Sequence, residues 1–574
     1  MKSPQYQRQI DDILQRPGFL RLIPTGDSAP SERSLDGTLL SLSSVASVLA
    51  LLLICVPLTI GAIGAFPIWD DASVWLLFQE RGVNALVASH RDRPVMGHLW
   101  SLLAVSENTF WGAAFVAQAL LWPALGLLSA LVWSHYFPTL RRFAGVVGCV
   151  AIAPFATKVQ MVTANIALAS FLSVALGYAA LVLLAGLIAR DDRWSRARFA
   201  AGVSLLALAI LIQEYALSVV IVIVVLFGST AWLWGDRERQ RRAFRVVGAS
   251  TVAAVAAYVI YFFLADRDAR ADVHPAHVIK LGGAYFLGLP LRFVSVLWQG
   301  IAGGVADSLS QVSFASRSNI FAAAYGVIAA LLLVYGCRRH SPTADESMRP
   351  KDVATALLFA VALIAGITPM VLMGRVPWDP NDGMSSRFGL PVLPLVAALI
   401  VFASVTLIRP RFWAAPVLVL GFAAGHAAFS DTWSAVRERR MMSHLGEALQ
   451  SYVSSAPGYT VAIIPLPERS LGPRRQWELT ARVAANWPSE LRERFWAYRF
   501  GGGLPLYADE EAGSVFGPRG SCRRPEEIDR EVRLVVRRGH LDRLLWAEPH
   551  SDGSISIEPY CITEREQNRI GRSK

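Results

Sequence analysis

Eleven apolar stretches separated by short polar segments determine what this chain can fold into. A helix needs roughly 20 apolar residues to cross a bilayer core about 30 Å thick, and the stretches approach or exceed that length. They run from about Leu39 to Phe66, Trp111 to Tyr136, Phe143 to Thr157, Val162 to Ala189, Phe199 to Ile212, Tyr215 to Trp234, Val246 to Leu264, Asn319 to Gly336, Val353 to Gly374, Phe388 to Ile408 and Phe412 to Phe429. The sequence therefore predicts an α-helical polytopic membrane protein with about eleven transmembrane helices.

The composition supports this class and excludes others. Only 17% of the 574 residues are charged and 53% are apolar, whereas soluble domains carry about 25% charged residues. A disordered chain needs low hydrophobicity, and five cysteines are too few for a disulfide-framed secreted domain. No P-loop, Rossmann glycine pattern, Gly-x-Ser-x-Gly elbow or Cys/His metal spacing occurs. No soluble-enzyme motif therefore competes with the membrane interpretation.

The basic residues are distributed unequally between the two sides that the apolar stretches define. With a cytoplasmic N-terminus, the inner segments hold 22 Lys and Arg residues and the outer loops hold 11. Cytoplasmic loops carry an excess of Lys and Arg, so residues 1–38 are expected to lie in the cytoplasm. The membrane is expected to be a bacterial inner membrane. Most of the formal net charge of +11 then lies on the cytoplasmic side, where it sets the orientation of the protein in the membrane. Basic runs such as Arg237 to Arg245 are explained in the same way, and nucleic-acid binding is not expected.

The chain divides into a membrane part and a polar C-terminal part. We expect a transmembrane domain over 39–429, with a first outer loop at 67–110, and an extracytoplasmic C-terminal domain over 430–574. Segment 276–311 is interpreted as re-entrant or interfacial. A full crossing there would place the basic loop 337–351 on the outer side.

The pattern of the C-terminal part predicts a small α/β or α+β domain. An amphipathic helix is expected from Arg437 to Tyr452, with strands at 460–464 and 533–536 and a hairpin turn at Asp552-Gly553. Cys522 and Cys561 are the only cysteines outside the predicted spans. An oxidising compartment would allow them to form a disulfide; two free thiols are the alternative.

Two polar sets lie in the first outer loop. Asp70 and Asp71 follow Trp69 directly after the first span. Adjacent carboxylates repel, so the pair is suited to attract a divalent cation or to accept a substrate proton; the alternative is that one of them caps the next helix. His90, Arg91 and Arg93 follow in the same loop. Arginines at a membrane face bind a phosphate bidentately or contact lipid headgroups.

Two more polar sets are expected on the outer side. Gln213-Glu214-Tyr215 interrupts a long apolar segment and predicts a tight hairpin; its carboxylate faces water, a metal or a cation, because a charge is costly in the membrane. The loop from Arg375 to Arg387 carries Trp378 and ends where the next span begins. Its Asp382-Gly383 pair is also a plain turn signal.

Together these sets resemble the GT-C superfamily of integral membrane glycosyltransferases. The likeness lies in an acidic pair after span one, Arg93-Pro94 in the first outer loop, Glu214 at a middle hairpin and Arg387-Phe-Gly-Leu-Pro entering a late span. Many members have Lys and Tyr where this chain has Gln213 and Phe388. The resemblance implies transfer of a sugar from a polyprenyl-phosphate-linked donor to the hydroxyl of a glycan, lipid or protein acceptor on the extracytoplasmic face.

The resemblance also implies roles for the residues. Asp70 or Asp71 is expected to be the general base of an inverting displacement. The substrate-binding residues are then His90, Arg91, Arg93, Trp378, Glu214 and Arg387. Asp71 and Glu214 are the expected ligands if a divalent cation, Mg²⁺ or Mn²⁺, takes part.

Three other classes of membrane protein remain open. A transporter or lipid flippase predicts broken helices near the midplane and paired halves, and no half-to-half similarity is apparent. An O-antigen ligase or polysaccharide polymerase usually has one large late outer loop, whereas the late loop here has 13 residues. A structural or sensory protein whose outer tail binds a partner is the third alternative.

Overall fold

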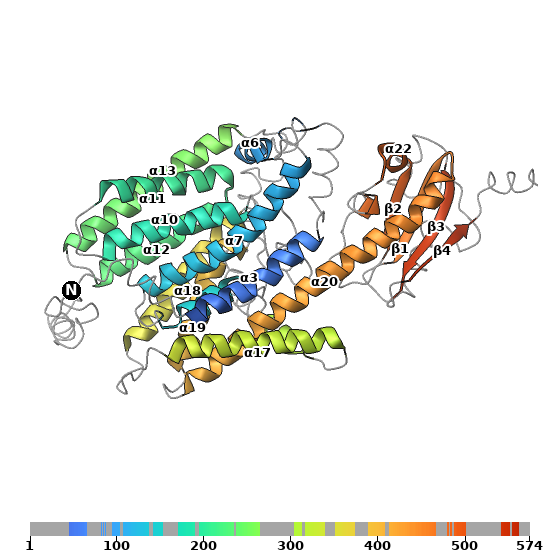
Figure 1. Ribbon diagram of the computed structural model, residues 1–574. Helices are drawn as coiled ribbons and strands as arrows, with labels where there is room; N and C mark the ends of the chain where they lie inside the picture. Colours follow the sequence, from blue (N-terminus) through green and yellow to red (C-terminus); the bar gives the residue numbers. More distant parts are fainter. Residues whose placement is uncertain are drawn as a thin grey trace, which may run out of the picture.

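The computed structural model describes the chain as helices followed by a small sheet (Figure 1). It describes residues 45–65, 82, 84, 87, 94–103, 107–136, 140, 142–152, 170–189, 195–234, 237–264, 304–310, 312, 316–338, 350–372, 389–407, 412–465, 479–480, 483–484, 487–500, 541–550 and 554–561. Among these, the helices are α3 (Val45–Ala65), α6 (Pro94–Leu103), α7 (Glu107–Tyr136), α8 (Ala144–Ile152), α10 (Leu172–Ala189), α11 (Arg196–Ile212), α12 (Ala216–Trp234), α13 (Arg237–Leu264), α16 (Gly304–Ser310), α17 (Arg317–Arg338), α18 (Pro350–Leu372), α19 (Leu393–Leu407), α20 (Ala414–Ser454) and α22 (Ser489–Arg492).

A helix overlaps each of the eleven apolar stretches of the sequence, and several helices begin before or end after the stretch. In the described part of the chain, three helices are long and apolar enough to cross a membrane, at Gln240–Tyr261, Arg317–Arg338 and Gly389–Thr406. Shorter apolar helices accompany them, among them Val45–Ile60, Leu172–Ile188 and Ala414–Ser430. Many large apolar side chains on these helices are exposed, which is expected of an integral membrane protein whose outer surface faces lipid.

The predicted hairpin between α11 and α12 is confirmed. α11 begins after Ser195, whose side chain accepts a hydrogen bond from the backbone N–H of Arg198. It ends at Ile212 because Gln213 takes an extended conformation, with φ of −158°. The chain then turns through Glu214 and Tyr215 and enters α12 at Ala216. Around this turn α11 packs against α10 and α13, and α12 packs against α13 and α18.

Small residues allow α17 and α20 to pack closely. A Cβ on Gly425 would lie 2.8 Å from Cβ of Ala329 and 3.0 Å from Cα of Gly326. A Cβ on Gly421, one turn earlier, would lie 2.9 Å from Cα of Ala330. Lipid provides little hydrophobic drive for helix association, so such close backbone contact is a main source of stability in membrane bundles.

One helix joins the bundle to the C-terminal sheet. α20 has 41 residues, about 60 Å at 1.5 Å per residue, and in Figure 1 it runs from the other helices to the strands. The sequence predicts an apolar span ending near Phe429 and a separate amphipathic helix from Arg437. The structure makes them continuous, because no Gly or Pro lies between these two positions to break the helix.

The sheet has four strands in the order β2-β1-β3-β4. β1 (Tyr459–Pro465) pairs in parallel with β2 (Phe495–Phe500) and β3 (Leu541–Pro549), and β3 pairs antiparallel with β4 (Ile555–Cys561). The predicted strand at 460–464 is confirmed, and β3 and β4 flank the predicted turn at Asp552-Gly553. The second half of α20 packs on one face of this sheet through Met442, Leu445, Leu449 and Val453. The predicted strand at 533–536 lies outside the described residues.

Candidate functional site

Glu214 is the member of the predicted site that the structure describes in full. Its side chain is only 7% exposed, so it is not in an open turn surrounded by water. The other predicted site residues lie outside the described part of the chain: Asp70, Asp71, His90, Arg91, Arg93, Trp378, Arg387 and Cys522. Cys561 is the last residue of β4, where its backbone pairs with Leu544.

A tyrosine from another helix holds the Glu214 carboxylate. The hydroxyl of Tyr261, near the end of α13, donates a hydrogen bond of 2.8 Å to Oε2 of Glu214. Tyr261 is fully buried, and its ring stacks on that of Tyr258 at 6.5 Å between centroids. This hydrogen bond fixes the direction of the carboxylate. Glu214 is thus held by α13 as well as by its own turn.

Serine hydroxyls fix the backbone of the same turn. Ser173 on α10 donates to the carbonyl oxygens of Ala209 at 2.9 Å and Gln213 at 3.2 Å. Ser170, just before α10, donates to Oε1 of Gln213 at 3.1 Å. Both serines and Gln213 are buried, so these bonds satisfy polar groups that water does not reach. The position of Glu214 is therefore determined by α11, which leads into the turn, and by the hydrogen bonds from α10 and α13.

Two elements next to predicted site residues belong to the same group of helices. α6 begins at Pro94, directly after Arg93, and packs against α11 and α7. The short helical turn at 389–392 follows Arg387, and the carbonyl of Pro391 accepts a hydrogen bond of 3.0 Å from Tyr178 on α10. The described segment after Arg93 thus contacts α11, which leads into the Glu214 turn, and the one after Arg387 contacts α10, whose Ser173 bonds to that turn.

Sequence reasoning missed several of these residues. Tyr261, Ser170 and Ser173 lie inside or beside predicted spans, where nothing in the pattern separates a polar partner from a lipid-facing residue. A second buried polar pair was also missed: Ser308 Oγ lies 3.1 Å from Nδ1 of His426, and both side chains are buried. His426 is the one histidine in the predicted span from Phe412 to Phe429, and that isolation was an available signal.

The turn can act as an acceptor of hydrogen bonds or as a cation ligand. An ionised carboxylate has more lone pairs than one phenolic hydroxyl occupies. Within the described residues, no group of three His, Cys, Asp or Glu side chains is arranged to hold a metal ion. The expected co-ligand of Glu214, Asp71, lies outside the described residues.

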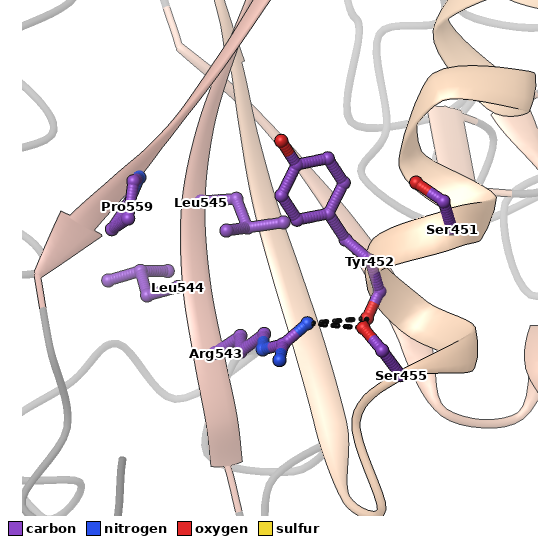
Figure 2. A pocket seen from close by; sticks show the side chains of 7 residues that line it. All are labelled: Ser451, Tyr452, Ser455, Arg543, Leu544, Leu545 and Pro559. Carbon is purple, nitrogen blue, oxygen red and sulfur yellow. Dashed lines mark hydrogen bonds between the residues drawn. The ribbon is translucent and has the colours of Figure 1, made fainter. Parts of the chain in front are cut away.

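A surface pocket of about 430 Å³ lies between the end of α20 and strands β3 and β4 (Figure 2). Arg543 crosses it and donates hydrogen bonds of 2.8 Å to the carbonyl of Tyr452 and to Oγ of Ser455. Leu544, Leu545 and Pro559 form its apolar wall. Arg543, the one charged side chain that lines the pocket, thus binds the end of α20. The pocket holds none of the site residues predicted from the sequence.

No protein-family model and no curated protein matches this chain.

Proposed function

We propose that this chain is an integral membrane glycosyltransferase of the GT-C type. It moves a sugar from a polyprenyl-phosphate-linked donor to an acceptor hydroxyl on the extracytoplasmic face. The observation that carries the proposal is the buried Glu214 carboxylate, held by Tyr261 at the junction of α11 and α12. A buried carboxylate in a membrane bundle is expensive and is typically retained for function.

The proposed topology follows from the charge distribution. About eleven crossings place residues 1–38 in the cytoplasm and the C-terminal part, 430–574, outside a bacterial inner membrane. A lipid-linked donor fits an outer-face site because nucleotide sugars are cytoplasmic. The apolar helices around the Glu214 turn provide a surface for the prenyl chain, and the acceptor is a glycan, a lipid or a protein.

The proposed reaction is a single displacement at the anomeric carbon. Asp70 or Asp71 accepts the proton of the acceptor hydroxyl while its oxygen attacks the sugar. The bond from the sugar to the polyprenyl phosphate breaks on the opposite face, and the phosphate leaves as an anion that Arg93 and Arg387 stabilise. Glu214 binds sugar hydroxyls as an acceptor. A divalent cation held by Asp71 and Glu214 would supply further charge neutralisation at the phosphate.

The test is a transfer assay with the purified full-length protein in lipid vesicles. Radiolabelled polyprenyl-phosphate glucose, mannose and arabinose are supplied in turn with a membrane extract as acceptor, and labelled product is measured. We expect Asp70→Asn or Asp71→Asn to lower the transfer rate by about 10²–10⁴-fold and Glu214→Gln to lower it as well. Glu238→Gln is the matched control, because Glu238 is exposed and pairs with Arg242 at the other end of α13.

Three outcomes would contradict the proposal. If the Asp70→Asn and Asp71→Asn variants are folded and inserted and both transfer sugar at the wild-type rate, neither aspartate is the general base. If the wild-type protein forms no labelled glycosyl product with any of these donors, the proposed activity is wrong. Movement of the lipid-linked sugar across the vesicle membrane without product would instead support the transporter or flippase alternative.

A further inference from the structure

α13 is the most exposed of the three candidate spans in the described part of the chain. Only 28% of its span, Gln240–Tyr261, is buried by other helices, compared with 67% of Gly389–Thr406. The helix also begins before its apolar part, so its first two turns extend the span at the predicted inner side. One long face of α13 is therefore available to a partner from the membrane.

Arginines recur along the first turns of this face. Arg237, Arg241 and Arg245 are exposed and are spaced four residues apart. Because an α-helix has 3.6 residues per turn, the three positions fall within an arc of about 80°. Glu238, the only acid among residues 237–245, pairs with Arg242 on a neighbouring face. The arginine stripe thus keeps its positive charge.

The same face becomes apolar further along the helix. Phe244 is 80% exposed, Val252 70% and Val255 58%. Val252 and Val255 lie in the same arc as the arginines, and Phe244 lies about 20° outside it. Gly248 lies between them, and a Cβ there would meet no atom within 4 Å. From Phe244 to Val255 the helix rises about 16 Å, close to half of the roughly 30 Å hydrocarbon core.

We propose that this face of α13 binds an anionic phospholipid of the inner leaflet. The phosphate contacts Arg241 and Arg245, with Arg237 adding long-range attraction, because guanidinium groups bind phosphate bidentately. The acyl chains lie along Phe244, Val252 and Val255 and fill the notch at Gly248. The headgroup carries a net negative charge, since a zwitterionic lipid would not complement three arginines. The inference does not depend on glycosyl transfer.

The experiment measures lipid retention by native mass spectrometry. Full-length protein in detergent is titrated with phosphatidylglycerol or with phosphatidylcholine of the same acyl chains. We expect preferential retention of phosphatidylglycerol. Arg241→Gln and Arg245→Gln should each lower that preference by about fivefold, which corresponds to about 1 kcal/mol per arginine near an anionic surface, and Arg237→Gln should lower it less. Arg317→Gln, an exposed arginine at the start of α17, is the matched control.

A second variant tests the acyl contact without removing charge. Gly248→Leu places a side chain in open space, so the helix is expected to fold normally and to retain less of both lipids. Equal retention of the two lipids by the wild-type protein would overturn the proposal. Unchanged preference in a variant that combines Arg237→Gln, Arg241→Gln and Arg245→Gln would also overturn it. If that variant does not fold, unchanged retention by Gly248→Leu would do so.

Discussion

The hydroxyl of Tyr261 lies 2.8 Å from Oε2 of Glu214, and it joins the end of α13 to the turn between α11 and α12. The two residues are 47 positions apart in the sequence, and both are buried. In a low-dielectric interior a phenol that donates to a carboxylate limits the directions in which the remaining lone pairs point. We therefore infer that Tyr261 positions Glu214 for its proposed contact with the sugar.

The first prediction is that Tyr261→Phe lowers glycosyl transfer by about tenfold or more. The substitution keeps the buried ring and removes only the hydroxyl, and a hydrogen bond to a charged group contributes about 1.5–3 kcal/mol. The measurement is kcat and KM in the vesicle assay. If Glu214 binds sugar in the ground state as well as in the transition state, KM rises; if the bond forms only in the transition state, kcat falls.

Tyr325→Phe is the control for this change. Its hydroxyl donates to the backbone carbonyl of Leu53, at the contact between α17 and α3, so it has no part in the Glu214 turn. We expect normal transfer and at most a small loss of thermal stability. Equal losses of activity in the two variants would show that Tyr261 matters only for folding.

The second prediction concerns the close contact between α17 and α20. Gly425→Ala is expected to lower the melting temperature of the detergent-solubilised protein, because the new Cβ would lie 2.8 Å from Cβ of Ala329 and 3.1 Å from the carbonyl oxygen of Tyr325. Overpacking of this kind costs about 1–3 kcal/mol. Gly186→Ala on α10 is the control, since a Cβ there meets nothing within 4 Å.

The control is expected to move in the opposite direction. Alanine is favoured over glycine in a helix by about 0.5–1 kcal/mol, so Gly186→Ala should leave stability unchanged or raise it. A melting temperature for Gly425→Ala at or above that of Gly186→Ala would show that α17 can move aside without cost.

Apolar periodicity predicted the helices but not their partners. The hairpin at Gln213-Glu214-Tyr215 was predictable because three polar residues interrupt a long apolar run. The strand at 460–464 was predictable because it is a short β-branched run before prolines. Such signals are local, and they depend only on the neighbours of each residue in the chain.

Contacts between distant residues could not be predicted in this way. Tyr261 is one of several tyrosines in apolar segments, and only its packing against the turn distinguishes it from Tyr258. The continuity of α20 depends on the absence of a helix breaker near residue 430, which a change from apolar to polar composition obscures. The convergence of Asp70, Asp71, Arg93 and Arg387 with Glu214 stays a prediction from the resemblance.

The third prediction concerns Arg543, which fastens the end of α20 to β3. Arg543→Leu removes two hydrogen bonds, to the carbonyl of Tyr452 and to Oγ of Ser455 (Figure 2). We expect faster amide hydrogen exchange in residues 541–549, by a factor that corresponds to about 1–3 kcal/mol. Arg440→Leu, an exposed arginine on α20, is the control and should leave the exchange unchanged. Equal protection in both variants would contradict this role for Arg543.

The fourth prediction concerns Gly446, where α20 packs closely against the backbone of Val483. A Cβ there would lie 2.3 Å from the carbonyl oxygen of Val483, and a backbone carbonyl cannot rotate away as a flexible side chain does. Gly446→Ala should therefore separate the helix from its packing partners Val483 and Trp487 and destabilise this region by about 2–3 kcal/mol. Limited proteolysis should then cleave residues 459–500 more rapidly. Ser454→Ala, which removes one exposed local hydrogen bond on the same helix, should not change the cleavage rate, and an equal rate in all three proteins would show that the contact is not needed.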